Sequence, residues 1–307
     1  MAQESATIKQ AKGPLVWLDM DQQALDDAYD QEKYAPNRAQ IVERRIANSE
    51  RTRAILGPPL SFAYGPSEIE KLDVFCTSKP RAPINIFIHG GAWRRNRAAD
   101  YALQAEMFVK SRAHHVLLDF TTVDESGGSL FPMAEQVRRA IVWVGRNAAS
   151  FGGDPDRIYL TGHSSGAQFG GCMVTTDWRE EGLPADLIKG ALLCSGMYDL
   201  APVRLSKRSQ YVNFTDEMVQ ALSAQRHLDK LATPLVLLYG TYETPEFQRQ
   251  TREFFSAVQA AGKPVKLIVG NGYNHFELLE TLANPYGLEG RAALEQMQLL
   301  PPGASGG

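Results

Sequence analysis

One segment of the chain reads Tyr159-Leu160-Thr161-Gly162-His163-Ser164-Ser165-Gly166-Ala167. A β-type run, Arg157 to Thr161, leads into Gly-x-Ser-x-Gly, and small residues able to begin a helix follow. This is the layout of a nucleophile elbow, a tight strand-to-helix turn that exposes a serine hydroxyl at the C-terminal edge of a sheet. Gly162 and Gly166 must be small, because the turn brings the two backbones together. The motif also occurs by chance, so the rest of the chain has to supply partners for Ser164.

Apolar runs on both sides of this motif predict the strands of a mostly parallel sheet. They are Pro83–Ile88, His115–Phe120, Ile158–Leu160, Gly190–Cys194, Pro234–Tyr239 and Val265–Val269. Strands that are apolar on both faces belong in a sheet that helices cover on each side. Helical patterns fall between them, at about 98–112, 133–150, 166–176, 245–261 and 276–281. This alternation predicts a doubly wound α/β sheet.

Two alternating runs precede the parallel strands. Leu60–Gly65 and Glu70–Cys76 are separated by Pro66-Ser67 and predict antiparallel strands at the edge of the sheet. Ahead of them, residues 15–58 have a mostly helical pattern. Asp19 or Asp21 is expected to cap a first short helix and Asn37 a second.

These patterns divide the chain into four parts. We expect a disordered tail over 1–14, a helical N-terminal segment over 15–58, an α/β domain over 59–298 and a second disordered tail over 299–307. The N-terminal segment would act as a cap over the mouth of a site, pack against the outside of the domain, or form a homodimer contact. The sequence does not separate these alternatives.

The totals place the chain among ordinary globular proteins. It has 307 residues, 44% of them hydrophobic, and a net charge of −3. A slightly acidic chain has no general attraction for nucleic acid or for anionic membranes. The cysteines Cys76, Cys172 and Cys194 are widely spaced in apolar runs, and we expect buried free thiols. With no signal-peptide pattern and no run of membrane-spanning length, this predicts a cytoplasmic protein.

The predicted strand before the elbow ends in His89-Gly90-Gly91-Ala92-Trp93. Two glycines after a buried strand can be an ordinary turn, but their position upstream of the elbow favours an oxyanion loop. The amides of Gly90 and Gly91, with that of Ser165, would hold the negative oxygen of a tetrahedral intermediate. One such donor is typically worth about 3 kcal/mol. His89 is expected to fix the loop, and Trp93 either walls a pocket or packs.

A serine hydroxyl needs a base, and His275 is the expected one. Of the six histidines, His89 and His163 belong to the motifs, His114 and His115 begin a strand, and His227 lies in a charged helical stretch. His275 follows the last predicted strand and a glycine-containing loop, where the chain order serine, acid, histidine places the base.

The acid that orients this histidine should follow the preceding strand. Glu243 lies on the turn directly after Pro234–Tyr239 and is the expected acid. Glu246 falls in the first turn of the next helix, where a carboxylate is favourable without a catalytic role. Asp199, after an earlier strand, is the other alternative.

The motifs together resemble one family. They are Tyr64-Gly65 with Glu70-Lys71-Leu72-Asp73-Val74-Phe75, His89-Gly90-Gly91-Ala92-Trp93, Gly162-His163-Ser164-Ser165-Gly166-Ala167, Glu243-Thr244-Pro245-Glu246-Phe247-Gln248-Arg249-Gln250 and Asn274-His275-Phe276-Glu277. From about Trp17 to about Leu279 the chain resembles the kynurenine formamidase (arylformamidase) family, on the hormone-sensitive-lipase-like esterase branch of the α/β-hydrolase fold. In that family the triad acid is an aspartate before Pro-Glu-Phe. Here that position is Glu243, which requires a different reach to His275.

The resemblance implies hydrolysis of N-formylkynurenine to kynurenine and formate, with no metal or organic cofactor. It also implies a small aromatic amide or ester as partner rather than nucleic acid or membrane. Trp93, Tyr273 and Tyr211 are expected to shape an aromatic pocket, and Asn213 is a weaker candidate. One alternative is a carboxylesterase or an amidase for another N-acylated aromatic amine, such as an N-acyl-anthranilate. The other is a non-catalytic binding protein on the same fold.

Overall fold

The computed structural model describes residues 13–300, so most of the two expected tails lies outside the described residues. Its centre is an eight-stranded sheet with the order β10-β9-β8-β7-β5-β6-β4-β3. The strands are β3 (Leu60–Ala63), β4 (Lys71–Phe75), β5 (Ala82–Ile88), β6 (His114–Leu118), β7 (Gly153–His163), β8 (Ile188–Cys194), β9 (Leu235–Gly240) and β10 (Val265–Gly270).

The pairing in this sheet follows the sequence pattern. The six strands that contain the apolar runs pair in parallel, whereas β3 pairs antiparallel with β4 and β4 antiparallel with β6. The two antiparallel strands lie at one edge, as predicted. At the centre, Gly162 of β7 is in register with Ile88 of β5 and Leu193 of β8. The turns after these three strands therefore meet at one edge of the sheet, around Ser164.

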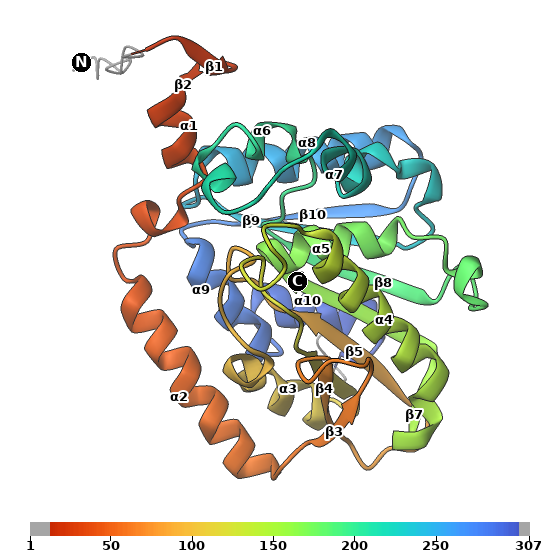
Figure 1. The fold of residues 1–307 in the computed structure, drawn as a ribbon. Coiled ribbons are helices and arrows are strands. Elements are labelled where there is room, and N and C mark those ends of the chain that lie inside the picture. The colour runs from red at the N-terminus through yellow and green to blue at the C-terminus, as the bar shows by residue number, and fades with distance from the viewer. Residues whose placement is uncertain (1–12, 301–307) are drawn as a thin grey trace.

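Helices cover both faces of the sheet, and each face has its own apolar core. On one face, α4 (Phe131–Asn147), α5 (Ser165–Val174) and α8 (Pro245–Ala260) pack on alternate residues such as Ile84 and Ile86. On the other, α3 (Ala105–Lys110) and α10 (Leu288–Gln296) pack on residues such as Phe87 and Leu192. Figure 1 shows α4 and α5 in front of the strands. Both faces of the central strands are buried, which explains why their sequences are continuously apolar.

The remaining elements are short connections around this core. They are η2 (Ala98–Gln104), η3 (Ala148–Phe151), η4 (Trp178–Glu181), α6 (Leu200–Val203), η5 (Lys207–Gln210), α7 (Asp216–Ala221), η6 (Ala224–Arg226), η7 (Leu228–Lys230), α9 (His275–Glu280) and η8 (Thr281–Ala283).

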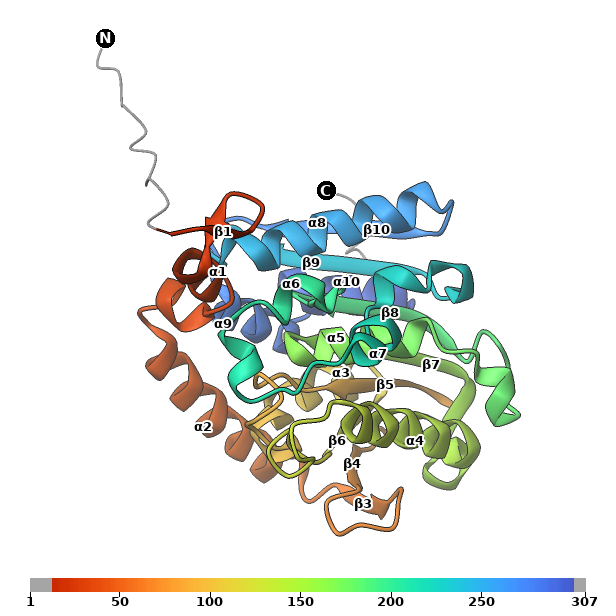
Figure 2. The same ribbon diagram turned by 45° about the horizontal axis from the view of Figure 1, so that its top comes forward.

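The N-terminal segment begins with a two-stranded hairpin that the sequence pattern did not predict. The hairpin is formed by β1 (Leu15–Trp17) and β2 (Met20–Asp21). The segment continues with α1 (Gln22–Ala28), η1 (Gln31–Tyr34) and α2 (Arg38–Leu56). Asp21 caps α1 by accepting a hydrogen bond from the Ala24 amide at 2.9 Å. Asn37 stands at the N-terminus of α2 but its side chain makes no capping bond. Figures 1 and 2 show this segment along one side of the molecule, with α2 beside α9.

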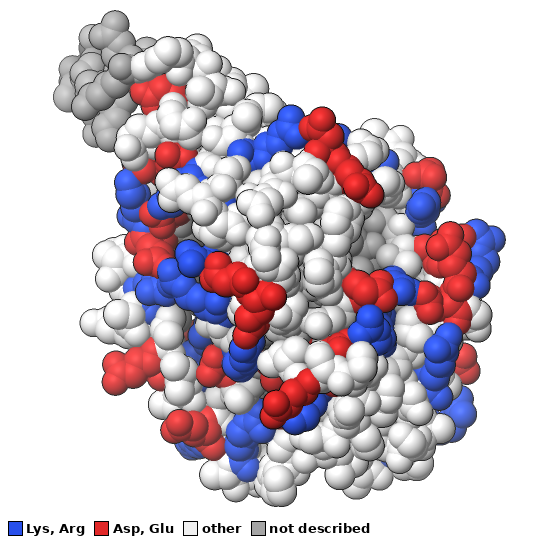
Figure 3. All heavy atoms as spheres, in the orientation of Figure 1, with Lys and Arg blue, Asp and Glu red and all other residues white. Residues whose placement is uncertain are grey.

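The surface carries both signs of charge. On the face drawn in Figure 3, acidic and basic side chains are interspersed. The expectation that all three cysteines are buried is wrong for Cys76, which directly follows β4 and is exposed to solvent; Cys172 and Cys194 are buried. Within residues 13–300, no helix has the length and apolar character needed to cross a membrane. The same residues contain no cluster of three or more His, Cys, Asp or Glu side chains suited to a metal ion.

Candidate active site

Ser164 occupies the turn between β7 and α5 and has a strained backbone. Its φ of 59° and ψ of −126° lie outside the regions that non-glycine residues prefer. A Cβ added at Gly166 would lie 2.1 Å from the Ile88 carbonyl oxygen, and one at Gly162 would lie 2.8 Å from the Gly166 carbonyl oxygen. The elbow geometry is thus confirmed, because only glycines allow strand and helix to approach this closely.

His275 approaches Ser164 from the first residue of α9. Its Nε2 lies 2.8 Å from Ser164 Oγ. Asn274 caps α9, since its side-chain oxygen accepts hydrogen bonds from the Phe276 and Glu277 amides at 3.0 and 3.1 Å. The His163 ring donates from Nε2 to the His275 carbonyl oxygen at 2.8 Å. The helix cap and this bond hold the imidazole in place.

Glu243 holds the other side of the imidazole. Its Oε2 lies 2.7 Å from His275 Nδ1. Its Oε1 accepts hydrogen bonds from the Gly240 amide at 2.7 Å and from Ser195 Oγ at 2.5 Å. The carboxylate is 2% exposed, and these partners replace the water it loses. Because Nδ1 faces a carboxylate, it carries the proton, which leaves Nε2 free to accept the proton of Ser164.

The two alternative acids are bonded elsewhere. Asp199 caps α6, accepting from the Ala201 amide at 3.0 Å, and pairs with Arg226 at 3.1 Å. Glu246 accepts a hydrogen bond from Tyr29 Oη at 2.8 Å and pairs with Arg249 at 2.6 Å. Of the three candidate acids, the structure brings Glu243 to His275.

The loop after β5 lies against the elbow. A Cβ added at Gly90 would lie 2.9 Å from the Ser164 Cβ, and Gly91 has a φ of 126° that favours glycine. Within residues 13–300, the amides of Gly90 and Gly91 donate no hydrogen bond. The Ser165 amide belongs to the first turn of α5, where amides have no partner inside the helix. These three amides are therefore available to an oxygen atom next to Ser164.

Buried side chains fix this loop. His89 Nδ1 and Asn96 Nδ2 both donate to the Gly90 carbonyl oxygen, at 2.8 and 3.1 Å. The His89 ring is stacked between Phe120 and Tyr101, at centroid distances of 4.4 and 5.6 Å. Burial lowers the pKa of His89 to about 4 and holds that of His163 well below its ordinary value. Both rings are therefore neutral at pH 7 and serve as uncharged hydrogen-bond donors.

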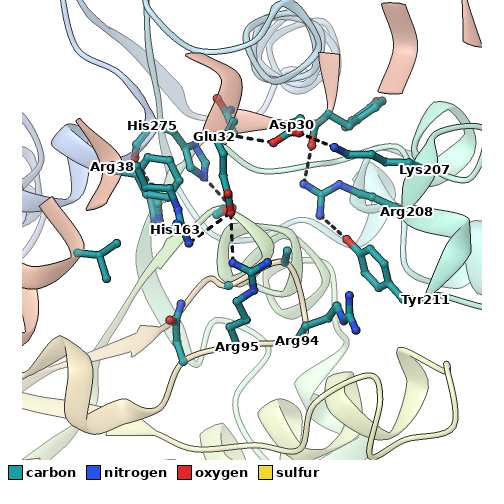
Figure 4. A pocket seen from close by; sticks show the side chains of 18 of the residues that line it. Asp30, Glu32, Arg38, Arg94, Arg95, His163, Lys207, Arg208, Tyr211 and His275 are labelled. Carbon is teal, nitrogen blue, oxygen red and sulfur yellow. Dashed lines mark hydrogen bonds and ion pairs between the residues drawn. The ribbon is translucent and has the colours of Figure 1, made fainter. Parts of the chain in front are cut away.

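Ser164 and His275 line a cavity of about 390 Å³. The N-terminal segment contributes much of its wall, including Tyr29, Gln31, Arg38 and Arg45. Figure 4 shows Arg208 and Tyr211 on the side of the cavity opposite His163 and His275. A volume of this size suits a small organic molecule.

The predicted aromatic wall is only partly present. Tyr211 lines the cavity, but Trp93 and Tyr273 do not. Trp93 is buried, and its Nε1 donates to Gln168 at 3.2 Å. Tyr273 packs against the apolar core on the face of the sheet that α3 and α10 cover, and its carbonyl oxygen accepts a hydrogen bond from the Tyr242 amide. Asn213 instead donates to the Gly127 carbonyl oxygen at 3.0 Å, on the loop before α4.

Gln31 is a site residue that the sequence analysis missed. Its Nε2 donates to Glu243 Oε2 at 2.9 Å, and its Oε1 accepts from the Thr244 amide at 3.2 Å. Gln31 thus bonds to two residues of the turn that carries Glu243, although it lies 212 residues before Glu243 in the chain. No local motif marks it, because its partner is set by how the N-terminal segment folds over the domain.

Comparisons with known proteins agree with this geometry. The BD-FAE family model matches residues 72–188. The chain is 27% identical to the kynurenine formamidase of Danio rerio over 87% of this chain and 94% of that protein. It is 26% identical to the isoprenylcysteine alpha-carbonyl methylesterase ICME of Arabidopsis thaliana, over 71% of this chain and 56% of that protein. The esterase LipW of Mycobacterium marinum has a similar fold, with a TM-score of 0.69, 15% identity, and coverage of 89% of this chain and 90% of that one.

These findings agree on the class of the protein. The chain has the α/β-hydrolase fold. It is a hydrolase that is similar in sequence to kynurenine formamidases and to esterases.

Proposed function

We propose that this hydrolase cleaves the formamide of N-formylkynurenine, releasing kynurenine and formate, and that Ser164, His275 and Glu243 are its catalytic triad. The observation that carries the proposal is the continuous chain of short contacts Ser164–His275–Glu243 opening on a cavity of about 390 Å³. The similarity to a kynurenine formamidase over most of both chains supports the substrate.

The first half of the reaction forms an acyl-serine. Ser164 Oγ attacks the formyl carbon while His275 Nε2 takes the hydroxyl proton, and the carbonyl electrons move to the oxygen. The amides of Gly90, Gly91 and Ser165 stabilise this oxyanion. When it collapses, the carbon–nitrogen bond breaks and His275 gives its proton to the departing aryl amine.

The second half of the reaction regenerates the free enzyme. A water molecule attacks the formyl-serine while His275 accepts one of its protons, and the same three amides stabilise the new oxyanion. The ester bond then breaks, formate leaves, and His275 returns its proton to Ser164. Glu243 stays ionised throughout and stabilises the imidazolium that forms in each half.

A second candidate function is hydrolysis of an ester, or of another N-acylated aromatic amine such as an N-acyl-anthranilate. It is favoured by the similarity to a methylesterase, since the same triad serves esters and amides. We also propose a cytoplasmic location, supported by unpaired cysteines that include the exposed Cys76.

A steady-state comparison tests the proposal. Purified protein would be assayed with N-formylkynurenine, with N-acyl-anthranilates of rising acyl length and with p-nitrophenyl esters, using Ser164→Ala as the blank. We expect the highest kcat/KM for N-formylkynurenine and no turnover above background in the variant. Equal or higher kcat/KM for longer acyl amides or for esters would assign the triad to the second candidate function instead.

A further inference from the structure

The lining of the cavity carries more positive than negative charge. Its cationic side chains are Arg38, Arg45, Arg94, Arg95, Lys207 and Arg208, and its acidic ones are Asp30 and Glu32. This excess lies in a chain whose net charge is −3, so it is a local feature. A concave site lined by one sign of charge attracts ligands of the opposite sign.

Most of these cations are partly exposed and already lie beside a carboxylate. Four of them have acidic partners: Lys207 pairs with Asp30, Arg38 and Arg95 pair with Glu32 at 3.3 and 3.2 Å, and Arg94 pairs with Asp124 at 2.9 Å. Exposed pairs of this kind hold little energy and are screened by salt. They contribute to the field of the cavity but do not mark one position for a ligand.

Arg208 differs from them in burial and in partners. It is 6% exposed, and among the described residues its Nη1 and Nη2 donate to Tyr211 Oη at 2.9 Å and to the Tyr29 carbonyl oxygen at 3.0 Å. Its buried Nε has no partner among the described residues, and none of their carboxylates pairs with it. Aromatic rings flank the guanidinium, with Trp93 at 5.4 Å and Phe247 at 5.9 Å. A buried charge without a counter-ion is costly, and an anion in the cavity would remove that cost.

Arg45 is the other buried arginine without a carboxylate partner, and its contacts indicate a different role. It is 7% exposed, and it donates to Tyr101 Oη at 3.2 Å and to Asn96 Oδ1 at 3.4 Å. Asn96 in turn donates to the Gly90 carbonyl oxygen. Arg45 thus supports the loop after β5, so its loss should affect every substrate alike.

We propose that Arg208, with the hydroxyl of Tyr211, forms an anion subsite that binds a carboxylate carried by the substrate away from the scissile bond. Figure 4 places these two side chains across the cavity from His275, so a small molecule can reach both. A guanidinium matches a carboxylate with two parallel hydrogen bonds. The proposal rests on the proposed function and narrows its substrates to aryl amides that bear a negative charge.

A charge-matched substrate pair tests the subsite. N-formylkynurenine and its methyl ester share the formamide, but only the first has a free carboxylate. In Arg208→Gln we expect kcat/KM for the acid to fall about 50-fold, mainly through KM, and that for the methyl ester to change less than about threefold. Arg208→Lys should recover part of the loss. Arg179→Gln, which changes an exposed arginine that pairs with Asp177 outside the cavity, is the control and should behave like wild type.

Two results would overturn the subsite. One is an equal fall for acid and methyl ester in a folded Arg208→Gln protein, which would make Arg208 a structural residue, as we expect of Arg45→Gln. The other is an unchanged kcat/KM for the acid. Circular dichroism of each variant reports whether it is folded.

A second substrate pair separates failure of the subsite from failure of the proposed function. If wild-type protein does not cleave the formamide, 4-acetoxyphenylacetate and its methyl ester are compared instead. A wild-type preference for the free acid that disappears in Arg208→Gln would retain the subsite in an esterase. The absence of that preference would overturn the subsite as well.

Discussion

At the residue scale, the hydrogen bonds around Glu243 explain how a glutamate can orient His275 at the position where the kynurenine formamidase family has an aspartate. Oε1 of the carboxylate accepts hydrogen bonds from Ser195 and from the Gly240 amide at the end of β9. Oε2 faces both His275 and Gln31. A glutamate has one more rotatable bond than an aspartate, and these four partners remove that freedom. The longer side chain is therefore as well oriented as a shorter one would be.

Neutralising this carboxylate tests its role. We predict that Glu243→Gln lowers kcat about 10³- to 10⁴-fold, because the amide no longer stabilises the imidazolium or fixes the tautomer of His275. The measurement is steady-state hydrolysis of whichever substrate the wild type cleaves best. Asp199→Asn is the control, since that residue pairs with Arg226 on the surface, and it should keep kcat within about threefold. A comparable loss in Asp199→Asn, or full activity in Glu243→Gln, would contradict the assignment.

The candidate triad could be predicted from residue order, but the cavity walls could not. The strand-turn positions of Ser164, Glu243 and His275 follow from motif spacing, and the structure brings all three together. Their catalytic roles stay a prediction. Trp93 was a candidate because it follows the glycines, yet a backbone φ of 64° turns it into the core. Which side of a loop faces a cavity depends on such local dihedrals, and sequence patterns do not report them.

At the element scale, the N-terminal segment is bonded to the turns that carry the site. Tyr29 donates to Glu246, Gln31 to Glu243, Asn37 to Glu277 and Arg44 to Glu280. The last three contacts reach Glu243 and α9, the helix that begins with His275. We therefore propose that residues 15–58 act as a cap, the alternative that places them over the mouth of the cavity.

Removing one of these contacts should affect turnover. We predict that Gln31→Ala lowers kcat about tenfold, because a donor to the Glu243 carboxylate is lost where water has little access. Gln23→Ala is a matched control on the same segment, since among the described residues the Gln23 side chain bonds to Asp27 of its own helix. The assay is steady-state hydrolysis with wild type alongside. Equal activity of the two variants would show that the segment only covers the domain.

The strands of the sheet could be predicted well and the packing of the N-terminal segment poorly, for a physical reason. The central strands are buried on both faces, so their sequences are apolar throughout and their parallel pairing followed. The buried face of α2 instead includes Arg45, Ser49 and Thr52 among its residues. Ser49, for example, bonds to the Asp100 carbonyl oxygen. A helix that packs through polar contacts has no apolar stripe from which its docking face can be predicted.

At the scale of the whole molecule, stability should depend on pH through buried titratable groups behind the site. Burial raises the pKa of Glu289 on α10 to about 8, and the nearby negative charge of Glu243 acts in the same direction. Burial also lowers the pKa of His115 to about 3 and that of His89 to about 4. The two kinds of group make stability change with pH in opposite directions.

For the histidines, the unfolded chain binds protons more readily, so stability falls as the pH falls from about 6.5 to about 4. For Glu289 the folded state holds the proton more tightly. Its contribution is therefore complete below about pH 4.5 and is lost as the pH rises to about 8.

A single substitution isolates the Glu289 contribution. Glu289→Gln keeps the shape of the side chain and cannot ionise, while the histidines are the same in both proteins and cancel in the comparison. We predict that the free energy of unfolding of the variant, minus that of wild type, rises by up to about 1.4 kcal/mol per pH unit between pH 4.5 and 8. Urea unfolding at several pH values measures it. A difference that stays constant with pH would show that Glu289 does not keep its proton in the folded state.

Covalent labelling tests whether Ser164 is a nucleophile that His275 activates. Folded protein would be treated with diisopropyl fluorophosphate, and the modified residue would be mapped by peptide mass spectrometry. We predict one adduct per chain on Ser164, no adduct in Ser164→Ala, and labelling at least about 100-fold slower in His275→Ala. Folded wild-type protein that stays unlabelled, or that is labelled at another residue, would contradict it.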